Sequence, residues 1–489
     1  MRREKENMAL SNSHFFLPDD WIDTLLGEVC LNPQYGWTTK SKEKGNVHLL
    51  RTSDITSGRI DWDSVPFCEK EPSEKEKYLL KNGDIVISRA GSVGYNYLIR
   101  DPKESVFASY LIRFQPLINN KYVSFFLNSP AYWKSISEKK LGITTANVNA
   151  TKLKQIPIPL PPLLEQHKIV EKFEELFTKL DAGVEALKKV KEQVKHYRQS
   201  VLKSAFEGKL TADWRQLMSN DELRVLNEKE ERFKIKIDNV DLPELPKSWI
   251  WTQLGNITKP SKEKVDPNKV GLTNYVGLEH IEKDTSKLLG YGSSHEVRSS
   301  KTKFYKGDVL YGKLRPYLNK VVVADFDGLC STDILVFPKS KNFINKFLAY
   351  RLFSKDFVRF ANLGISGVQH PRTSFNKIFP FKIALPLLQE QKKIVEEIER
   401  RFSIADEIEN TVDKSLKQAE KLRQSILKKA FEGKLTEKWR EEHPALISGE
   451  NSAEKLLEKI KKEKAKIEVE MKSKSRQKRK RESKLSSKR

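Results

Sequence analysis

LPPLLEQHKIVEKFEELFTKL opens a stretch of sequence (residues 160–215) that occurs a second time in the chain, at residues 385–440, where it opens with LPLLQEQKKIVEEIERRFSIA. Both copies end in nearly the same way, in RQSVLKSAFEGKLTADWR and RQSILKKAFEGKLTEKWR. Gln166 in the first copy corresponds to Gln391 in the second, an offset of 225 residues that needs no gap. The chain therefore contains an internal repeat, and its fold has to be read as two halves.

Each copy predicts one long helix. Pro161 and Pro386 stand just before the helix, where proline is tolerated, and Gly208 and Gly433 supply the stop signal. An acidic residue, which favours the first turn of a helix, begins each copy as Glu165 or Glu390. A helix of about 43 residues would be roughly 65 Å long.

Apolar residues recur at steps of three and four through both copies, with Lys and Glu on either side. This heptad-like pattern is typical of helices that pair along their length. Since one long amphipathic helix cannot bury its stripe alone, we expect the two copies to form an antiparallel coiled coil. The expected seam is Val170, Phe173, Phe177, Leu180, Val184, Leu187, Val190, Val194, Tyr197, Val201 and Ala205 in the first copy, and Val395, Ile398, Phe402, Ala405, Ile408, Val412, Leu416, Ala419, Leu422, Ile426 and Ala430 in the second.

The helices alone are also compatible with a structural bundle or an oligomerisation coil. The identical sequence AFEGKLT at both helix ends points further, because a simple coil needs only its seam to be repeated. Surface-type residues are repeated in it as well, which predicts a surface used twice by two copies of one partner. The residues expected on it are Glu207, Lys209, Thr211, Glu432, Lys434 and Thr436.

The chain of 489 residues is 32% charged and has a formal net charge of +24, which favours a polyanionic or acidic partner. The tail at 471–489 holds ten Lys and Arg against Glu482 alone, so +9 lies there and +15 is spread over the rest. Nucleic acid is the leading partner, and a solvated basic surface is the alternative. Three scattered cysteines and eight histidines without metal-ligand spacing predict neither a disulfide framework nor a zinc site. With no membrane span or signal peptide expected, the chain is predicted to be cytoplasmic.

A more loosely repeated segment precedes each helix, beginning with LPDDW at Leu17 and LPKSW at Leu245. In both segments, short runs rich in β-branched residues alternate with turn signals, which predicts strands. A predicted helix follows the strands of each segment. Each segment is therefore expected to form an α+β domain. The expected divisions are a flexible start (1–16), a first domain (17–159), the central helix (160–215), a charged connector (216–244), a second domain (245–384), the second helix (385–440), a charged helical segment (441–470) and a basic disordered tail (471–489).

Two loops occupy the same frame in both halves but differ in content. After Gly142 the chain reads ITTANVN, whereas after Gly367 it reads VQHPRTS, and the loop SRAGSVG of the first domain corresponds to GKLRPYL in the second. Such side chains meet base edges and phosphates of DNA, so these loops predict two readers of different short sequences. Ordinary divergence of polar loops is the alternative. The candidate DNA-binding residues are Arg89, Ser92, Thr144, Thr145, Asn147, Lys313, Arg315, Tyr317, Gln369, His370 and Arg372.

The motifs of common nucleotide-binding and hydrolytic enzymes are missing from the sequence, including GxxxxGK[ST], GxGxxG after a strand, GxSxG and HExxH. No Asn-Pro-Pro-aromatic tetrapeptide of adenine methyltransferases occurs either. His370 is a candidate for a general base, but an isolated loop histidine is more often a surface or structural residue. We therefore predict a binding protein with no catalytic residues and no metal site.

The doubled order of these segments resembles the specificity (S) subunits of type I restriction–modification systems, over nearly the whole chain from Leu17 to about Arg440. The resemblance implies two mixed α/β target recognition domains separated by two long antiparallel coiled-coil helices. It implies that each domain binds half of a split, asymmetric site in double-stranded DNA, and that the helices dock two modification (M) subunits. S-adenosylmethionine would belong to the M subunits, and ATP and Mg to restriction (R) subunits, with no cofactor in this chain.

Two alternatives stay open on the sequence alone. The chain could be a self-contained nuclease or methyltransferase with unrecognised motifs, which activity of the isolated chain would reveal. It could also be a coiled-coil scaffold without a role in DNA binding, against which the basic body argues.

Overall fold

The computed structural model describes residues 17–140, 147–218, 242–269, 271, 273–341, 343–363, 365 and 370–486. The expectations for the start of the chain and for most of the connector at 216–244 lie outside these residues. The chain divides into two compact units. Unit 1 comprises Met1–Glu185 and Ser415–Arg489, and unit 2 comprises Ala186–Lys414.

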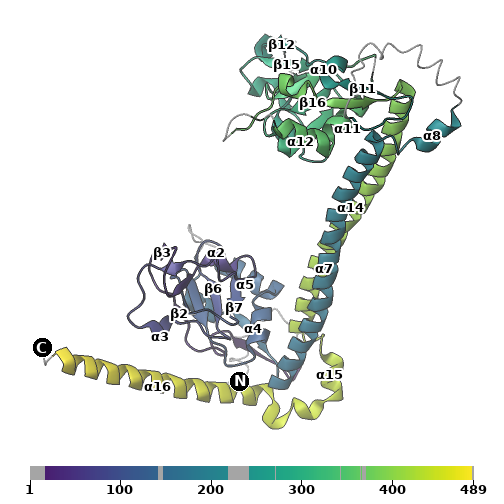
Figure 1. Cartoon of the computed structure of the whole chain (residues 1–489). Coiled ribbons are helices and arrows are strands. Elements are labelled where there is room, and N and C mark those ends of the chain that lie inside the picture. The colour runs from purple at the N-terminus through teal and green to yellow at the C-terminus, as the bar shows by residue number, and fades with distance from the viewer. Residues whose placement is uncertain are drawn as a thin grey trace. The chain divides into compact units, whose positions relative to one another are not determined.

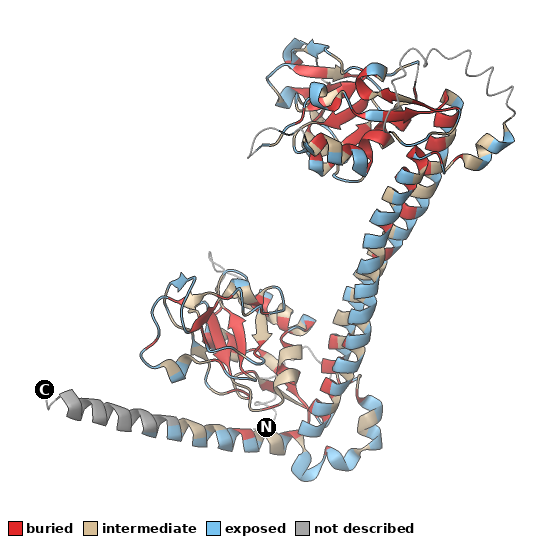
Figure 2. Cartoon of the chain, in the orientation of Figure 1, coloured by how far each residue is buried: buried red, intermediate tan, exposed pale blue. Residues whose placement is uncertain are grey.

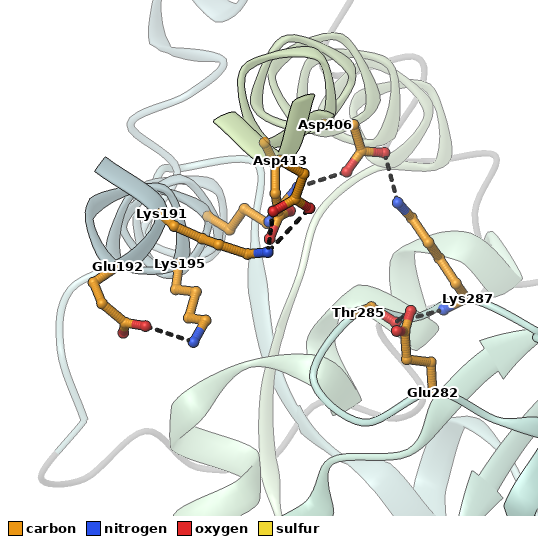
Figure 3. A network of polar contacts seen from close by, with 10 residues as sticks. Lys191, Glu192, Lys195, Glu282, Thr285, Lys287, Asp406 and Asp413 are labelled. Atoms are coloured by element: carbon orange, nitrogen blue, oxygen red, sulfur yellow. Dashed lines mark hydrogen bonds and ion pairs between the residues drawn. The ribbon is translucent and has the colours of Figure 1, made fainter. Parts of the chain in front are cut away.

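The two repeated stretches form α7 (Leu163–Phe206) and α14 (Leu388–Phe431), each 44 residues long (Figure 1). They lie antiparallel in both units. As residue numbers increase along α7, the residue numbers of their contact partners on α14 decrease. In unit 1, Arg423 forms an ion pair with Asp181, and in unit 2 Lys191 Nζ lies 2.7 Å from Asp413 Oδ1 (Figure 3). The predicted antiparallel pair of helices is confirmed.

The seam is covered most completely where a domain packs on the helices. Phe173, Ala205 and Ile398 are buried, whereas Tyr197 and Leu422 are 40% and 51% exposed. Three of the expected seam residues are thus on the surface: Tyr197, Ile408 and Leu422. The physical reason is that a two-helix pair covers only a narrow stripe, so side chains at its margin stay in contact with water. Figure 2 shows the alternation of buried and exposed residues along both helices.

The first domain is built from short strands and short helices within unit 1. β1 (Ile22–Leu25) pairs antiparallel with β10 (Pro157–Leu160), so the start of the domain lies beside the strand that leads into α7. Two four-stranded sheets have the orders β2-β9-β6-β7 and β3-β5-β4-β8. Their strands are β2 (Gln34–Tyr35), β3 (Ser41–Lys42), β4 (His48–Leu50), β5 (Phe67–Cys68), β6 (Ile85–Ser88), β7 (Asn96–Leu98), β8 (Ser105–Phe107) and β9 (Leu111–Phe114); the helices are α2 (Thr52–Ile55), α3 (Lys75–Tyr78), α4 (Asn120–Phe126), α5 (Pro130–Lys140) and α6 (Ala150–Lys154).

The second domain repeats this plan within unit 2. β11 (Ile250–Gln253) pairs antiparallel with β20 (Lys382–Leu385), and the sheets have the orders β12-β15-β18-β13-β14 and β17-β16-β19. The strands are β12 (Lys264–Val265), β13 (Asn274–Val276), β14 (Gly292–Ser293), β15 (Lys301–Phe304), β16 (Val309–Gly312), β17 (Val321–Val323), β18 (Gly328–Cys330) and β19 (Ile334–Phe337); the α-helices are α10 (Leu254–Ile257), α11 (Asn345–Phe353), α12 (Lys355–Leu363) and α13 (Phe375–Ile378). The expected α+β domains are confirmed.

Each domain shares its core with the helices of its own unit. Phe173 of α7 and Phe431 of α14 belong to the core of the first domain, and Phe206 of α7 and Ile398 of α14 to that of the second. Polar contacts add to this in unit 2, where Lys287 Nζ of the second domain lies 3.1 Å from Asp406 Oδ2 of α14 (Figure 3). Each domain is therefore packed against the helices of its own unit through a shared core.

The chain continues beyond α14 with α15 (Glu437–Glu442) and α16 (Ala453–Ser486). α16 includes residues up to Ser486, although low apolar content predicts a disordered tail from residue 471. The physical reason is local: the segment is rich in Lys, Arg and Glu, which are good helix formers, and it contains neither Gly nor Pro. The disordered tail at residues 471–489 stays a prediction.

Candidate nucleic-acid interface

The two candidate loops of the first domain lie side by side. The loop after β6 and the segment before α6 meet in an antiparallel bridge between Ala90 and Asn147. The backbone N–H of Val148 donates to the carbonyl of Arg89 at 3.0 Å, which fixes the two segments together. Residues separated by more than fifty positions in the sequence thus lie side by side in the domain.

The second domain joins its corresponding loops in the same way. Leu314 and Arg372 form the antiparallel bridge, and the N–H of Thr373 donates to the carbonyl of Lys313 at 3.0 Å. A third bond runs from the N–H of Arg315 to the carbonyl of Pro371 at 2.7 Å. The frame predicted to be common to both domains is therefore a real structural element, and its side chains differ between them.

In the first domain the interface centres on Arg89. Its guanidinium carbon lies 5.1 Å from the ring centre of Tyr35, so the cation rests on an aromatic face. Arg89 Nε and Asn147 Oδ1 are buried and have no hydrogen-bond partner among the residues that the structure describes. A guanidinium held flat against a ring is suited to planar hydrogen bonding with a base edge through its terminal nitrogens.

Exposed polar and aromatic groups surround this pair. Ser92 is exposed, and Tyr110 is 61% exposed while its carbonyl accepts from the N–H of Arg89 at 2.9 Å. Tyr35 and Tyr110 were not singled out from the sequence. The signal that could have found them is a tyrosine at the end of a short polar strand, which is too common to identify a site.

In the second domain the position of Arg89 is taken by Lys313, and Arg372, which corresponds to Asn147, is engaged by a carboxylate. Arg372 Nε donates to Asp333 Oδ1 at 3.1 Å, and the carbonyl of Asp333 accepts from the N–H of Lys313 at 2.8 Å. Arg315, which has a positive φ of 51°, and Tyr317, which is 51% exposed, lie on the loop that follows β16 and contains Lys313. His370 is exposed and lies in the segment that is bridged to this loop. Asp333 is the acidic residue that sequence reasoning missed. Thr144, Thr145 and Gln369 lie outside the described residues.

A second arrangement, buried and repeated, lies at the beginning of each long helix. Glu165, in the first turn of α7, is fully buried and accepts from Trp21 Nε1 at 2.8 Å and from Thr436 Oγ1 at 2.6 Å. Arg440 Nη1 donates to the same carboxylate at 2.7 Å and to the carbonyl of Gly433 at 3.1 Å. We call this set, Trp21, Glu165, Thr436 and Arg440, the first clasp.

The second clasp consists of Trp249, Glu390, Thr211 and Arg215 in unit 2. Glu390, in the first turn of α14, is fully buried and accepts from Trp249 Nε1 and from Thr211 Oγ1, both at 2.8 Å. Arg215 forms an ion pair with Glu390 and also donates to the carbonyl of Gly208. Each clasp thus joins the start of one domain, the start of one helix and the turn that ends the other helix.

Comparison with known proteins identifies the repeat. A family model described as the type I restriction modification DNA specificity domain matches the chain twice, at residues 18–196 and 252–418. These two matches cover most of the chain. The chain belongs to the family of type I restriction–modification specificity subunits.

Two curated relatives match this chain over nearly their whole lengths. The chain is 31% identical to the type I restriction enzyme EcoDI specificity subunit of Escherichia coli over 430 residues, which are 87% of this chain and 95% of that protein. It is 28% identical to the EcoKI specificity subunit of E. coli strain K12, over 92% of this chain and 96% of that protein. A solved chain from a study of assembly and conformational transition of a type I system has the same fold, with a TM-score of 0.62, 17% identity, and coverage of 86% of this chain and 100% of that one.

As a specificity subunit with two target recognition domains, the chain recognises DNA and is not itself catalytic. The alternatives of a self-contained enzyme and of a scaffold without DNA are thereby set aside. Within the described residues, no group of His, Cys, Asp and Glu is arranged to hold a metal ion. Across the same residues, no helix has the length and apolar character that crossing a membrane requires.

The clasps correct one sequence prediction about this specificity subunit. Thr211 and Thr436 were expected on a partner-docking surface, yet both are buried and bind a glutamate of their own chain. The shared AFEGKLT sequence is explained by this internal role: the phenylalanine enters a core, the glycine takes a positive φ at the helix end, and the threonine reaches the clasp. The predicted surface is therefore reduced to its charged members, Glu207, Lys209, Glu432 and Lys434.

The charged members remain accessible in the specificity subunit. Glu207 and Lys209 are exposed and contact each other at 2.7 Å, and Lys434 lies 2.8 Å from the partly exposed Glu432. The same Glu–Lys pair therefore stands on the surface beside each clasp.

The glutamine next to each clasp glutamate has a matching internal role. Gln166 Oε1 accepts from the N–H of Asn119 at 3.2 Å, and Gln391 Oε1 accepts from the N–H of Ile344 at 2.9 Å. Both glutamines are fully buried. The Glu-Gln pair at the start of each helix was visible in the sequence as part of the repeat, but its polar character suggested a helix surface and concealed its burial.

Burial at the first clasp also affects Tyr122 of α4. Its hydroxyl donates to the carbonyl of Pro159 at 2.8 Å, and the residue is fully buried. Burial raises the pKa of the Tyr122 phenol well above its ordinary value, and the nearby Glu165 carboxylate raises it further. The phenol therefore stays neutral and holds the strand that leads into α7.

Proposed function

We propose that the two target recognition domains of this chain read the two halves of a split, asymmetric site in double-stranded DNA. The supporting observation is the pair of bridged loops, which has the same backbone arrangement in both domains but different side chains. Arg89 and Asn147 are the readers proposed for the first half-site, and Lys313, Arg315 and Arg372 for the second. A formal net charge of +24 supplies the sequence-independent attraction to phosphates.

In this proposal the chemistry belongs to other subunits. Two modification subunits would bind beside the clasps, where the exposed pairs Glu207–Lys209 and Glu432–Lys434 offer the same surface twice. They would bring S-adenosylmethionine for methylation of adenine N6, and restriction subunits would add ATP and Mg for translocation and cleavage. The complex would work in the cytoplasm, where these partners meet DNA.

The test is to map methylated adenines in a host that expresses this chain together with its modification subunit. The expected result is a split motif of two defined half-sites joined by a gap of unspecified bases. A host carrying the modification subunit alone is the matched control and should lack the motif. Methylation that is independent of this chain, or that follows one continuous motif, would contradict the proposal.

We predict that the length of the helix pair sets the number of unspecified base pairs between the two half-sites, and that it does not affect which bases are recognised in each half-site. Inserting seven residues into α7 and seven into α14, each between the positions of the Asp181–Arg423 and Lys191–Asp413 contacts, keeps the seam in register and lengthens both helices by about 10 Å. Since one duplex turn of about 34 Å holds about ten base pairs, the mapped gap should grow by about three base pairs. Replacing seven residues at the same positions, without lengthening, should leave the gap unchanged. New half-site letters with the old gap would overturn this prediction.

A further inference from the structure

Tyr110 has a defined place beside the bridged loops of the first domain. Strands β6 and β9 pair with Ser88 opposite Leu111, so the next pair outward is Arg89 and Tyr110. The backbone continues the pairing at this point, because the N–H of Arg89 donates to the carbonyl of Tyr110 at 2.9 Å. Tyr110 therefore lies directly beside the candidate reader of the first half-site.

Asp333 has the same place in the second domain. β16 and β19 pair as β6 and β9 do, and the N–H of Lys313 donates to the carbonyl of Asp333 at 2.8 Å. Because Lys313 stands where the first domain has Arg89, Asp333 stands where it has Tyr110. One domain thus presents an uncharged phenol beside its bridged loops, and the other presents a carboxylate.

The carboxylate of Asp333 is paired with Arg372 in the absence of DNA. Arg372 Nε donates to Asp333 Oδ1 at 3.1 Å and Arg372 Nη2 to Asp333 Oδ2 at 3.4 Å, so both carboxylate oxygens are used. The side chains of Arg372 and Asp333 are 49% and 24% exposed. An ion pair that water reaches contributes little to stability, so a ligand of the right chemistry can take the place of either partner.

A carboxylate on a DNA-reading surface accepts hydrogen bonds and donates none. It repels phosphates, and in the major groove the N7 and O6 of guanine and the O4 of thymine are acceptors like itself. The donors in that groove are the exocyclic amino groups, N4 of cytosine and N6 of adenine. The basic residues Lys313 and Arg315 attract DNA of any sequence, whereas Asp333 favours only DNA that presents an amino group to it.

We propose that Asp333 is a specificity-determining residue of the second half-site, whose carboxylate accepts a hydrogen bond from the exocyclic amino group of a cytosine or an adenine. When DNA binds, Arg372 exchanges Asp333 for a DNA group, and the carboxylate accepts from the amino group instead. A base with an acceptor at that place leaves the carboxylate unpaired against DNA, which lowers affinity. This inference rests on the proposed function, since it assigns a further base contact to the second domain.

The experiment compares four variants with the full chain, each assembled with its modification subunits. Asp333→Ala removes the carboxylate, and Asp333→Asn keeps its shape without its charge. Tyr110→Ala changes the corresponding place in the first domain. Glu263→Ala is the control for loss of an acid, because Glu263 belongs to the second domain, is 45% exposed and lies 3.6 Å from Lys303.

The probes are duplexes that contain the mapped split motif, a set in which each base pair of both half-sites is replaced singly by the other three, and an unrelated duplex of equal length. Binding is titrated at several salt concentrations by fluorescence anisotropy. The set includes the reversal of each base pair, which moves the amino group to the opposite side of the major groove and so reports on its position.

Asp333→Ala is expected to lose discrimination at one base pair of the second half-site. The full chain should prefer cytosine or adenine over guanine or thymine there by about fivefold or more, the lower end of the usual cost of a mismatched pair, and the variant should bind all four about equally. Its affinity for the unrelated duplex should rise. The slope of log K against log salt should steepen by about 0.9, because Arg372, released from Asp333, binds one more phosphate.

The other variants separate the carboxylate from general effects. Since an amide both accepts and donates, Asp333→Asn should keep its affinity for the motif and gain affinity for guanine or thymine at the same base pair. Tyr110→Ala should change discrimination in the first half-site only, and without a steeper salt slope, because tyrosine carries no charge. Glu263→Ala should leave base discrimination unchanged in both half-sites.

The exchange of partners by Arg372 has a test of its own. Arg372→Ala should lower affinity for the motif more strongly in the Asp333→Ala background than in the full chain, because no ion pair with Asp333 then has to break when DNA binds. Two neighbouring residues that share a partner are expected to be non-additive in this way. An equal or smaller loss in the double variant would contradict the exchange.

Two outcomes would overturn the role of Asp333. One is an equal loss of affinity of Asp333→Ala for every duplex, which would show that the carboxylate only supports the loop. The other is unchanged discrimination throughout the second half-site, which would show that it contacts no base. Failure of the proposed function has a different appearance, because the full chain itself would then fail to distinguish the motif from the unrelated duplex.

Discussion

Replacing Glu165 with alanine is expected to lower the free energy of unfolding of unit 1 by about 3–5 kcal/mol. The mutation leaves the partly buried Arg440 charge without its partner and removes the buried acceptor of Trp21 and Thr436 at once, and breaking a buried charge pair from one side has effects of this size. Glu390→Ala is expected to have the same effect in unit 2. The measurement is urea denaturation followed by fluorescence, in which the buried indoles of Trp21 and Trp249 report on the two clasps.

The matched control is Glu171→Ala in the same helix. Glu171 pairs with Lys168 at 2.9 Å, but its side chain is 64% exposed, so its loss should change stability by less than about 1 kcal/mol. Trp21→Phe removes only the indole donor and should fall between the two. If Glu165→Ala behaves like Glu171→Ala, the clasp does not stabilise the unit, and the repeated AFEGKLT sequence must have a cause other than the clasp.

Arg89→Ala and Arg372→Ala are expected to relax opposite halves of the recognised DNA site. A bidentate contact between arginine and a guanine edge discriminates by about 1–3 kcal/mol, which corresponds to about 5- to 150-fold in affinity. Arg89→Ala should reach the upper part of this range, because the Arg89 guanidinium is already held against the Tyr35 ring. Arg372→Ala should have the smaller effect, because a contact with DNA would have to replace its bonds to Asp333.

The measurement is binding of the reconstituted complex to duplexes with single base changes in either half-site. Arg400→Ala serves as the control, since Arg400 lies on α14, is 58% exposed and pairs with Glu397 at 3.0 Å. A uniform loss over all sequences for Arg89→Ala would assign that residue to phosphate contact. A change at the half-site of the other domain would contradict the assignment of one domain to each half-site.

Much of the fold follows from the sequence because the repeat and its periodicity are long. The two long helices α7 and α14, their antiparallel pairing and the α+β character of both domains agree with what the pattern predicts. The frame of the loops was also predictable, since Gly142 and Gly367 keep the offset of the helices. That Ala90 meets Asn147 and Leu314 meets Arg372 was not, because pairing between distant segments leaves no local trace.

The clasps show a different limit of sequence reasoning. The repeat indicates that Thr211 and Thr436 have the same role in both halves of the chain. It does not indicate whether these side chains are buried or on the surface. Thr, Glu and Arg are mostly exposed in proteins, so composition favours a surface. In the clasps they are buried because each group finds a partner supplied by another part of the chain, and only tertiary structure supplies that information.

Unit 1 consists of two stretches that are far apart in the sequence, and this affects when it can fold during synthesis of the chain. Unit 2 is one continuous stretch, whereas unit 1 needs residues 415–489 as well as residues 1–185. Glu165 emerges from the ribosome early, but Thr436 and Arg440, which complete its surroundings, are translated almost three hundred residues later. Since domains tend to fold in the order of their synthesis, the domain made first is in this chain the one finished last. A nascent chain that stalls before residue 436 leaves Glu165 without two of its three side-chain partners, Thr436 and Arg440.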